Sequence, residues 1–381
     1  MDLAEENPCF YVGTDDHADP LREHAVFPLL ADPQSYVAGT WDMRHNHEQR
    51  TYWLGLFRSH FPLLMAEARR ERADAGADTE AVECALNKAQ SDFMAYVDAC
   101  EADPDGIERL DILSLCWARE RALRAVGIAD PYRLAKAEHT ESALGFLTAW
   151  LEELDAMPRA EKWESLLRGV LAGNLFDLGA TKTVHLYQEG GQAPTFHDTL
   201  SKLKPRPWFC DDADAFLAEW PGRMFNKALL FIDNAGPDVV LGMLPLAREL
   251  ARYGRVVVVA NGAPSLNDVT ISELDALLER VSAMDPTVAE QVRTGRMTTV
   301  SSGNWAPLID LTLISPELAA EASDGVDLVV LEGMGRAIET NLEAKLTCDV
   351  LKMAMIKDEG VASAKGAGLF DLVCRFESAE S

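Results

Sequence analysis

The sequence lacks the cysteine patterns that indicate a disulfide framework or a zinc site. Its seven cysteines are scattered through 381 residues, with no Cys-x-x-Cys pair and no cysteine–histidine cluster at zinc spacing. No apolar run reaches the length of a transmembrane helix, and the acidic residues 1–6 do not resemble a signal peptide. We therefore expect reduced, mostly buried cysteines in a soluble, cytoplasmic protein.

Positive charge is scarce as well. The chain has 35 lysines and arginines against 62 aspartates and glutamates, which gives a net charge of -27. A field of this sign repels polyanions, so nucleic acid and anionic membranes are excluded as partners. A small phosphate ester is not excluded, because a bound metal ion would dominate the field around it. The hydrophobic content of 48% is that of an ordinary globular protein.

The chain also lacks a complete dinucleotide-binding fingerprint and a Walker A loop. It has instead an apolar run at residues 228–232 that predicts a buried parallel strand, followed at once by Asp233 and Asn234. Residues 239–250 then have the apolar spacing of a helix. In an open α/β sheet, ligands bind in the crevice between such a strand end and helix start. A carboxylate and an amide there suit a hard divalent cation.

The same arrangement repeats directly afterwards. Residues 255–260 predict a second buried strand, and the loop after it carries Asn267 and Asp268 before a capping-box pair, Thr270 and Glu273. Consecutive parallel strands usually lie side by side, so the two acidic loops are expected to meet. Either loop alone could be a simple helix cap. Two adjacent loops, each with an aspartate and an asparagine, favour a metal site.

The periodicity divides the chain into two parts. The first part is rich in amphipathic helices, expected over residues 51–70, 79–100, 109–126 and 141–154. The second part alternates buried strands and helices, with further strands expected over residues 297–301, 326–331, 350–356 and 369–376. We predict an α/β fold: a Rossmann-like, doubly wound, mainly parallel sheet over residues 201–381, with an attached helical domain over residues 1–200.

Two further features follow later strands at the same edge. The loop from Glu332 to Arg336 contains glycines that allow close backbone approach, and Arg336 could fork onto phosphate or pair with an acid. Lys357 follows the strand expected at residues 350–356. It is either an ordinary surface lysine at a strand end or a charge that neutralises a phosphoryl group.

A third feature lies in the helical part, in the apolar residues 169–179. Asn174 and Asp177 are about one helical turn apart there, so a helix would place them on one face. They are either a hydrogen-bonded polar pair in the core or a wall of the ligand pocket.

With these residues in place, the chain resembles the damage-control metal-dependent phosphatase family, and within it the branch of 4′-phosphopantetheine phosphatases. The resemblance runs from Phe27 to Phe376, and the loop from Glu332 to Arg336, continued through Asn341, is the signature of the branch. The other segments that carry it are residues 172–179, 205–208, 233–236, 264–268 and 302–304.

The resemblance implies a metal site and a substrate class. Its metal ligands fall on Asp233, Asn234 and Asp268, and its phosphate-contacting lysine falls on Lys357. The implied cation is Mn²⁺ or Co²⁺, with Ni²⁺ or Mg²⁺ as alternatives, and the implied substrates are 4′-phosphopantetheine and its S-oxidised forms.

Catalytic roles are expected for Asp233, Asp268 and Lys357. Substrate contacts are expected from Lys357, Asn174, Asp177, Glu332, Arg336 and Asn341.

The expected chemistry is metal-assisted hydrolysis of a phosphomonoester. None of the expected strands ends in the Asp-x-Asp nucleophile motif of the haloacid-dehalogenase phosphatases, which favours attack by water. The sequence leaves covalent attack by an aspartate open, and it does not determine the oligomeric state. Two alternative functions stay open: a sugar-phosphate phosphatase of the same family, and a non-catalytic sensor that binds a phosphorylated pantetheine compound.

Overall fold

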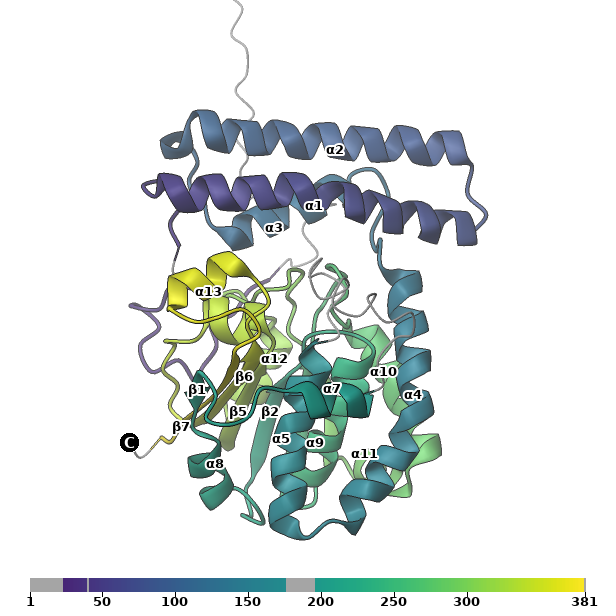
Figure 1. The fold of residues 1–381 in the computed structure, drawn as a ribbon, viewed down its shortest axis with the longest axis vertical. Coiled ribbons are helices and arrows are strands. Elements are labelled where there is room, and N and C mark those ends of the chain that lie inside the picture. Colours follow the sequence, from purple (N-terminus) through teal and green to yellow (C-terminus); the bar gives the residue numbers. More distant parts are fainter. Residues whose placement is uncertain (1–22, 40, 176–195, 380–381) are drawn as a thin grey trace, which may run out of the picture.

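The structure is a computed structural model and describes residues 23–39, 41–175 and 196–379. Within this part of the chain, seven strands form one sheet in the order β1-β7-β6-β5-β2-β3-β4 (Figure 1). Neighbouring strands are parallel, except that β6 and β7 are antiparallel. The strands are β1 (Cys210–Asp211), β2 (Lys227–Phe231), β3 (Arg255–Ala260), β4 (Met297–Ser301), β5 (Val326–Glu332), β6 (Asp349–Met355) and β7 (Leu372–Glu377).

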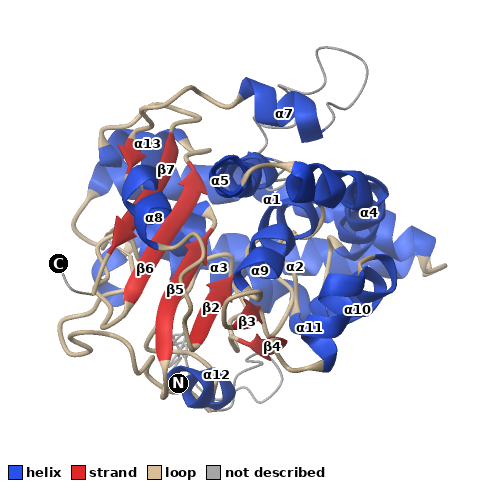
Figure 2. Cartoon of the chain, turned by 90° about the horizontal axis from the view of Figure 1, so that it is seen from below, coloured by secondary structure: helices blue, strands red, loops and turns tan. Residues whose placement is uncertain are grey.

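Both faces of the sheet are buried. Along β2, the side chains of Leu229 and Phe231 join one hydrophobic core, whereas those of Ala228 and Leu230 join the other. Successive side chains of a strand point to opposite faces, so a strand covered on both faces needs apolar residues at every position. This explains the absence of a polar side in residues 228–232. Figure 2 shows the helices on both sides of the sheet.

One face is covered by helices from both halves of the chain. The residues of this core include Trp150, Leu167, Val240 and Leu277, which come from four different helical segments. The elements that contribute are α4 (Arg133–Ala156), α5 (Arg159–Leu175), α7 (Phe196–Lys202), α8 (Ala213–Glu219), the π-helix η2 (Asp238–Met243), α9 (Leu244–Leu250), α10 (Ile271–Met284) and α11 (Pro286–Arg293).

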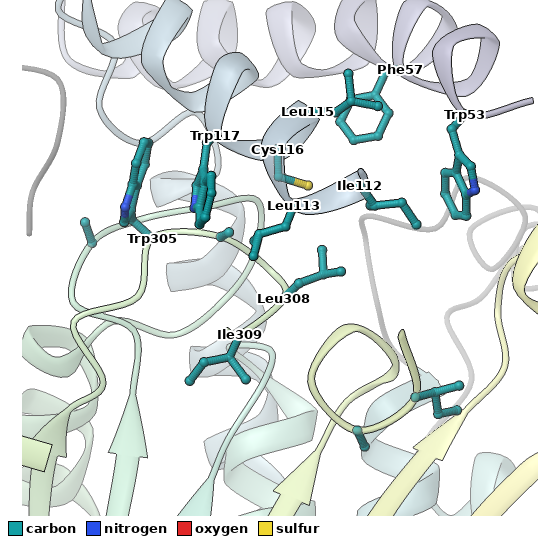
Figure 3. Packing of buried hydrophobic residues seen from close by; sticks show 14 of the residues in the cluster. Trp53, Phe57, Ile112, Leu113, Leu115, Cys116, Trp117, Trp305, Leu308 and Ile309 are labelled. Carbon is teal, nitrogen blue, oxygen red and sulfur yellow. The ribbon is translucent and has the colours of Figure 1, made fainter. Parts of the chain in front are cut away.

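The other core extends beyond the end of the sheet into a helical layer. Helices α1 (His47–Asp74), α2 (Thr79–Ala102) and α3 (Ile112–Arg124) form this layer, which lies across the end of the sheet in Figure 1. Figure 3 shows Ile112 and Cys116 of α3 above the loop that carries Leu308. The short 3-10 helix η1 (Pro104–Gly106) precedes α3, and α12 (Pro316–Ala322), the π-helix η3 (Met334–Thr340) and α13 (Glu359–Lys365) complete the described helices.

Side-chain caps fix where the helices near the sheet end begin. Asp111 caps α3 in a capping box with Ser114, and Thr270 caps α10 in the predicted capping box with Glu273. These caps satisfy the first backbone N–H groups of each helix. None of the described helices combines the length and the apolar character needed to cross a bilayer.

The doubly wound, mainly parallel sheet with an N-terminal helical region confirms the predicted fold class. Helices α4 and α5, both before residue 200, nevertheless pack in the same core as β2, β3 and β5. The division into domains at residue 200 therefore stays a prediction, and the helical layer that stands apart from the faces of the sheet consists of α1, α2 and α3.

Candidate metal and phosphate site

The site lies where the order of the strands reverses. The chain runs from β2 outward to β3 and β4, and it then returns to β5 on the other side of β2. The carboxyl ends of β2 and β5 are thus neighbours, which is the point where ligands bind in open α/β sheets. Asp233 and Glu332 lie at these two ends, and the backbone N–H of Asp233 donates to Glu332 Oε2 at 2.9 Å.

The two acidic loops predicted to meet do meet. A backbone bridge joins Asn234 to Asp268, and the N–H of Ala235 donates to the carbonyl oxygen of Asn267 at 2.9 Å. The guanidinium of Arg336 connects the two loops, because it pairs with the carboxylates of both Asp233 and Asp268. The structure therefore brings together the three residues on which the implied ligand set falls: Asp233, Asn234 and Asp268.

A second group of carboxylates lies behind Asp233. Asp233, Asp238 and Glu332 have oxygens within 4.8 Å of one another, the spacing needed to hold a metal ion. The amide nitrogen of Asn174 lies among these three carboxylates, at 2.7 Å from Glu332 Oε1, 3.2 Å from Asp238 Oδ2 and 3.5 Å from Asp233 Oδ2. An amide N–H group thus occupies the position between the acids, and the cluster forms a hydrogen-bonded support for Asp233.

Burial strongly affects the ionisation of this inner cluster. Loss of hydration raises the pKa of Asp238 to about 6, and the neighbouring charge of Asp233 adds to the effect. Burial likewise raises the pKa of Glu332 well above its usual value, with the charges of Asp238 and Asp233 as further causes. A cluster of this kind retains a proton more readily than isolated carboxylates, unless a cation compensates its charge.

The hydrogen bonds of Asn234 orient its amide toward the cavity. Its Nδ2 donates to Asp238 Oδ2 at 2.9 Å and to Asp233 Oδ2 at 3.1 Å. Since the nitrogen is held by two carboxylates, the amide oxygen faces the other way. Asp238 Oδ1 is buried and has no hydrogen-bond partner in the described part of the chain. This buried carboxylate oxygen, together with the carboxylates of Asp233 and Asp268 and the amide oxygen of Asn234, fits a divalent cation.

Arg336 is a structural cation rather than a surface group. It is 2% exposed, and its Nη2 donates to Asp268 Oδ2 at 2.7 Å and to Asn261 Oδ1 at 2.9 Å. Burial opposes its charge, but the carboxylates of Asp268 and Asp233 outweigh burial and raise the pKa of Arg336. Of the two roles that the sequence left open, the structure shows the pairing with acids.

Lys357 is not a solvated lysine at a strand end. It is 4% exposed, and its Nζ donates to the carbonyl oxygen of Asn174 at 2.7 Å. It also lines the cavity in front of Asp233 and Asp268. A buried ammonium group beside these carboxylates is placed to interact with a phosphoryl group at the same site.

The other predicted substrate-contacting residues lie behind the cavity wall. Asn174 and Glu332 belong to the inner hydrogen-bond network, and neither lines the cavity. Asn341 is fully buried, accepts from the hydroxyl of Tyr36 at 2.7 Å and donates to the carbonyl oxygens of Ile309 and Arg336. Their direct contact with substrate stays a prediction. Asp177 lies outside the described residues.

The cavity in front of these residues has a volume of about 390 Å³. Its floor is the edge of the sheet with Asp233, Asn234, Asp268 and Lys357, and its roof comes from α1 and α3 of the helical layer. The roof and sides are largely apolar. The residues that supply this apolar surface are Trp53, Leu56, Phe57, Ile112, Cys116, Leu266, Pro307, Leu308 and Met334.

Acidic groups dominate the charge of the cavity. The carboxylates of Asp233, Asp268, Glu339, Asp358 and Glu359 line it, while the described lysine and arginine side chains that line it belong to Lys357 and Arg119 alone. Burial, followed by the charges of Asp358 and Asp233, raises the pKa of Glu339 to about 8. An anionic ligand would be repelled from such a cavity without an added cation, so the charge balance itself favours a metal ion with the substrate.

Gly333 is a position at which the backbone constrains the site. Its φ of +100° lies in the region that favours glycine, and a Cβ at this position would collide with the carboxylate of Asp233. We expect the Gly333→Ala variant to lose about 2–4 kcal/mol of its free energy of unfolding, because backbone strain and steric overlap add. It should also bind Mn²⁺ more weakly, since the Asp233 side chain must move.

The matched control for this prediction is Gly366→Ala. Gly366 has a φ of +71° at the end of α13, but a Cβ there would meet nothing within 4 Å. It isolates the cost of the left-handed backbone, about 1 kcal/mol, without touching the site. Chemical denaturation and Mn²⁺ titration of both variants check the prediction. Equal losses of stability, with unchanged Mn²⁺ affinity in both, would contradict it.

Sequence reasoning missed several residues of the site. Asn261 directly follows β3 and holds Asp268 Oδ2 with its amide at 2.9 Å, so its position at a strand end was an available signal. Asp238 lies four residues after Asn234 in the same segment, and no local pattern marks it as part of the inner cluster. Glu339 and Arg119 reach the cavity only through the folding of η3 and of the helical layer.

Comparison with known proteins identifies the family of the chain. The family model of the damage-control phosphatase ARMT1-like domain matches residues 57–373, which include Asp233, Asn234, Asp268 and Lys357. The chain belongs to this family. A solved structure of a DUF89 family protein from Pyrococcus horikoshii has the same fold, with a TM-score of 0.55 at 18% identity over 83% of this chain and 96% of that chain.

Curated relatives are named as phosphatases or carry a kinase name. A damage-control phosphatase of Arabidopsis thaliana is 36% identical over 86% of this chain and 88% of its own length. The 4′-phosphopantetheine phosphatase of Mus musculus is 33% identical over 92% of this chain and 48% of its own length. The chain is also 38% identical over 95% of its length to 42% of a protein of Arabidopsis thaliana named pantothenate kinase 2. It thus spans less than half of the mouse protein and of the kinase-named plant protein.

Proposed function

We propose that this protein is a metal-dependent phosphatase that hydrolyses 4′-phosphopantetheine and its S-oxidised forms. The observation that carries the proposal is the meeting of Asp233, Asn234 and Asp268 on the floor of a cavity that Lys357 also lines. The family match and the name of the mouse relative support the activity and the substrate.

The residues present fit a divalent cation on the floor of the cavity. Asp233 and Asp268 would supply carboxylate oxygens and Asn234 an amide oxygen, with Asn174, Asn261 and Arg336 holding them in place. Mn²⁺ or Co²⁺, with Ni²⁺ or Mg²⁺ as alternatives, would supply positive charge to the phosphoryl oxygens of the bound ester. The inner carboxylates Asp238 and Glu332 would fix the position of Asp233.

The chain's own residues would perform the remaining work. The ammonium of Lys357 would neutralise charge on the equatorial phosphoryl oxygens as the ester bond breaks. The walls of the cavity would exclude bulk water and fix the ester on the floor. We propose that a water molecule attacks phosphorus, since the aspartates at the floor are engaged by Arg336 and Asn261.

The size of the cavity favours a substrate longer than a sugar phosphate. A volume of about 390 Å³ lies within the range of pockets that enclose drug-sized ligands, and its roof and sides are apolar. An ester with an extended, mostly uncharged chain would bury that chain against Leu56, Phe57 and Leu308. A short, hydroxyl-rich sugar would leave this apolar surface uncovered.

The test is a phosphate-release assay with Mn²⁺-loaded protein. We expect kcat/KM for 4′-phosphopantetheine or its S-oxidised form to exceed that for fructose 1-phosphate by at least about tenfold, a difference of about 1.4 kcal/mol in transition-state binding. Chelation should abolish release, and added Mn²⁺ should restore it. Equal or faster turnover of the sugar phosphate would assign the protein to sugar-phosphate hydrolysis. Tight binding without release of phosphate from any ester would make it a sensor.

A further inference from the structure

Arg119 is a buried arginine whose guanidinium is only partly used by the protein. It lies on α3, is 4% exposed and lines the roof of the cavity. Its Nε and Nη2 both donate to Glu120 Oε1, at 3.1 Å and 2.7 Å. Its Nη1 has no hydrogen-bond acceptor among the described residues.

Packing holds this guanidinium in one orientation. The plane lies over the ring of Phe57, with Cζ 5.6 Å from the ring centroid. One edge of the fork is engaged by Glu120, whose Oε1 also accepts from the hydroxyl of Ser265 at 2.9 Å. A planar guanidinium has its donors in fixed directions, so the Nη1 group points away from Glu120. A buried arginine normally satisfies its donors, and the open cavity is where an acceptor for Nη1 can lie.

The position of Arg119 complements that of Lys357. Lys357 is on the floor with the carboxylates, whereas Arg119 is on the roof, one helical turn from Cys116. The cavity therefore has a cation at the phosphate end and a second cation elsewhere on its wall. The described residues that line the cavity include five carboxylates. An arginine with an open donor in such a cavity can select ligands that carry an anionic group.

We propose that Arg119 is a specificity-determining residue that donates hydrogen bonds to an anionic, oxygen-rich group at the end of the substrate remote from the phosphate. This inference rests on the proposed function. The ligand class is a phosphate ester with an extended apolar or amide-containing chain and a terminal sulfonate or carboxylate. The open Nη1 group suits such groups, because hydrogen bonds from a charged guanidinium to an anionic oxygen are stronger than those between neutral groups.

The probe is 4′-phosphopantetheine sulfonate, compared with the short ester p-nitrophenyl phosphate. We expect Arg119→Gln to lower kcat/KM for the sulfonate about 10- to 100-fold more than for the short ester, the loss typical of a hydrogen bond to a charged group. Arg119→Lys should recover only part of the loss, since it keeps the charge but not the fork. Arg121→Gln is the matched control: it makes the same change on the same helix, but Arg121 does not line the cavity.

A purely structural role predicts a different result. Through Glu120 and Ser265, Arg119 is connected to the loop of Asp268. If that connection were its whole purpose, Arg119→Gln would weaken Mn²⁺ binding and lower turnover of both esters by the same factor. Such a parallel loss would overturn the inference. The double variant Arg119→Gln/Glu120→Gln removes both charges of the pair, so it tests the same ratio without leaving a buried unpaired acid.

Binding measurements separate this inference from the proposed function. Isothermal titration of the sulfonate onto the metal-loaded protein should give a Kd that rises about tenfold or more in Arg119→Gln and in the double variant. A wild-type protein that binds the sulfonate in this Arg119-dependent way but releases no phosphate from any ester would contradict the phosphatase and support the role of Arg119. An active wild-type protein whose variants keep an unchanged Kd for the sulfonate would support the phosphatase and contradict the role of Arg119.

Discussion

The Asp268→Asn variant is expected to lose phosphatase activity by at least about 10³-fold in kcat/KM, about 4 kcal/mol of transition-state stabilisation. Asparagine keeps the shape of the side chain but removes the negative charge that a divalent cation needs on this side of the floor. We expect the Kd for Mn²⁺ to rise by about 10²-fold or more. Calorimetric titration with Mn²⁺ and phosphate release from 4′-phosphopantetheine measure the two effects.

A matched control separates loss of the ligand from loss of a buried ion pair. Asp268 pairs with Arg336, and Asp285 pairs with Arg248 in the same way, at 3.0 Å and away from the cavity. Asp285 also caps α11, a role that asparagine can fill. Asp285→Asn should therefore cost stability but leave Mn²⁺ binding and turnover of the folded protein near wild type. Near-normal Mn²⁺ binding in Asp268→Asn would show that the metal lies elsewhere, for example in the inner cluster with Glu332.

The sheet was predictable because its strands carry an unusually clear signal. Residues 228–232 and 255–260 are apolar at every position, since β2 and β3 lie between two cores. Antiparallel β7 also has a buried half that could be read as a strand, but its direction depends on contacts with β6 that no local pattern encodes. Helix α4 begins at Arg133, eight residues before the expected start at residue 141. The sequence did not indicate these first turns as helical, because they carry mainly polar side chains.

The floor of the site was predictable for a related reason. Asp233, Asn234 and Asp268 follow strands that are easy to identify, and adjacent parallel strands place their carboxyl ends together. Topology alone therefore brings these residues close, whatever the details of packing. The sequence predicted that Glu332 follows a strand at the same edge of the sheet. In the structure, Glu332 lies beside Asp233 at the switch point between β2 and β5.

The roof and the support of the site could not be predicted in this way. Arg119 and Phe57 lie on amphipathic helices whose apolar faces only indicate burial, and their approach to the sheet end depends on how α1 and α3 pack. Buried polar contacts such as that of Asn174 with Glu332 join residues 158 positions apart. Periodicity carries no information on such pairs, because it describes one element at a time.

A substitution of Lys357 tests charge neutralisation separately from metal binding. We expect Lys357→Met to lower kcat/KM for 4′-phosphopantetheine by about 10²-fold or more, the scale for losing one preorganised donor at a developing charge. Methionine fills much of the same volume, so the variant loses the ammonium without a large cavity. The free energy of unfolding should fall by about 1 kcal/mol, because the carbonyl oxygen of Asn174 loses its donor at 2.7 Å.

The direction of the change in metal affinity distinguishes Lys357 from the ligands. Lys357 is a cation beside Asp233, so it repels a divalent ion, and its removal should leave Mn²⁺ affinity unchanged or increase it. Asp268→Asn should have the opposite effect.

Lys357→Arg should restore little turnover, because the planar fork differs in shape and donor directions from the ammonium. Lys365→Ala, which removes an equal charge from the end of α13 outside the cavity, is the control. Turnover of Lys357→Met within about twofold of wild type would remove Lys357 from the site and leave its contact with Asn174 as its whole role.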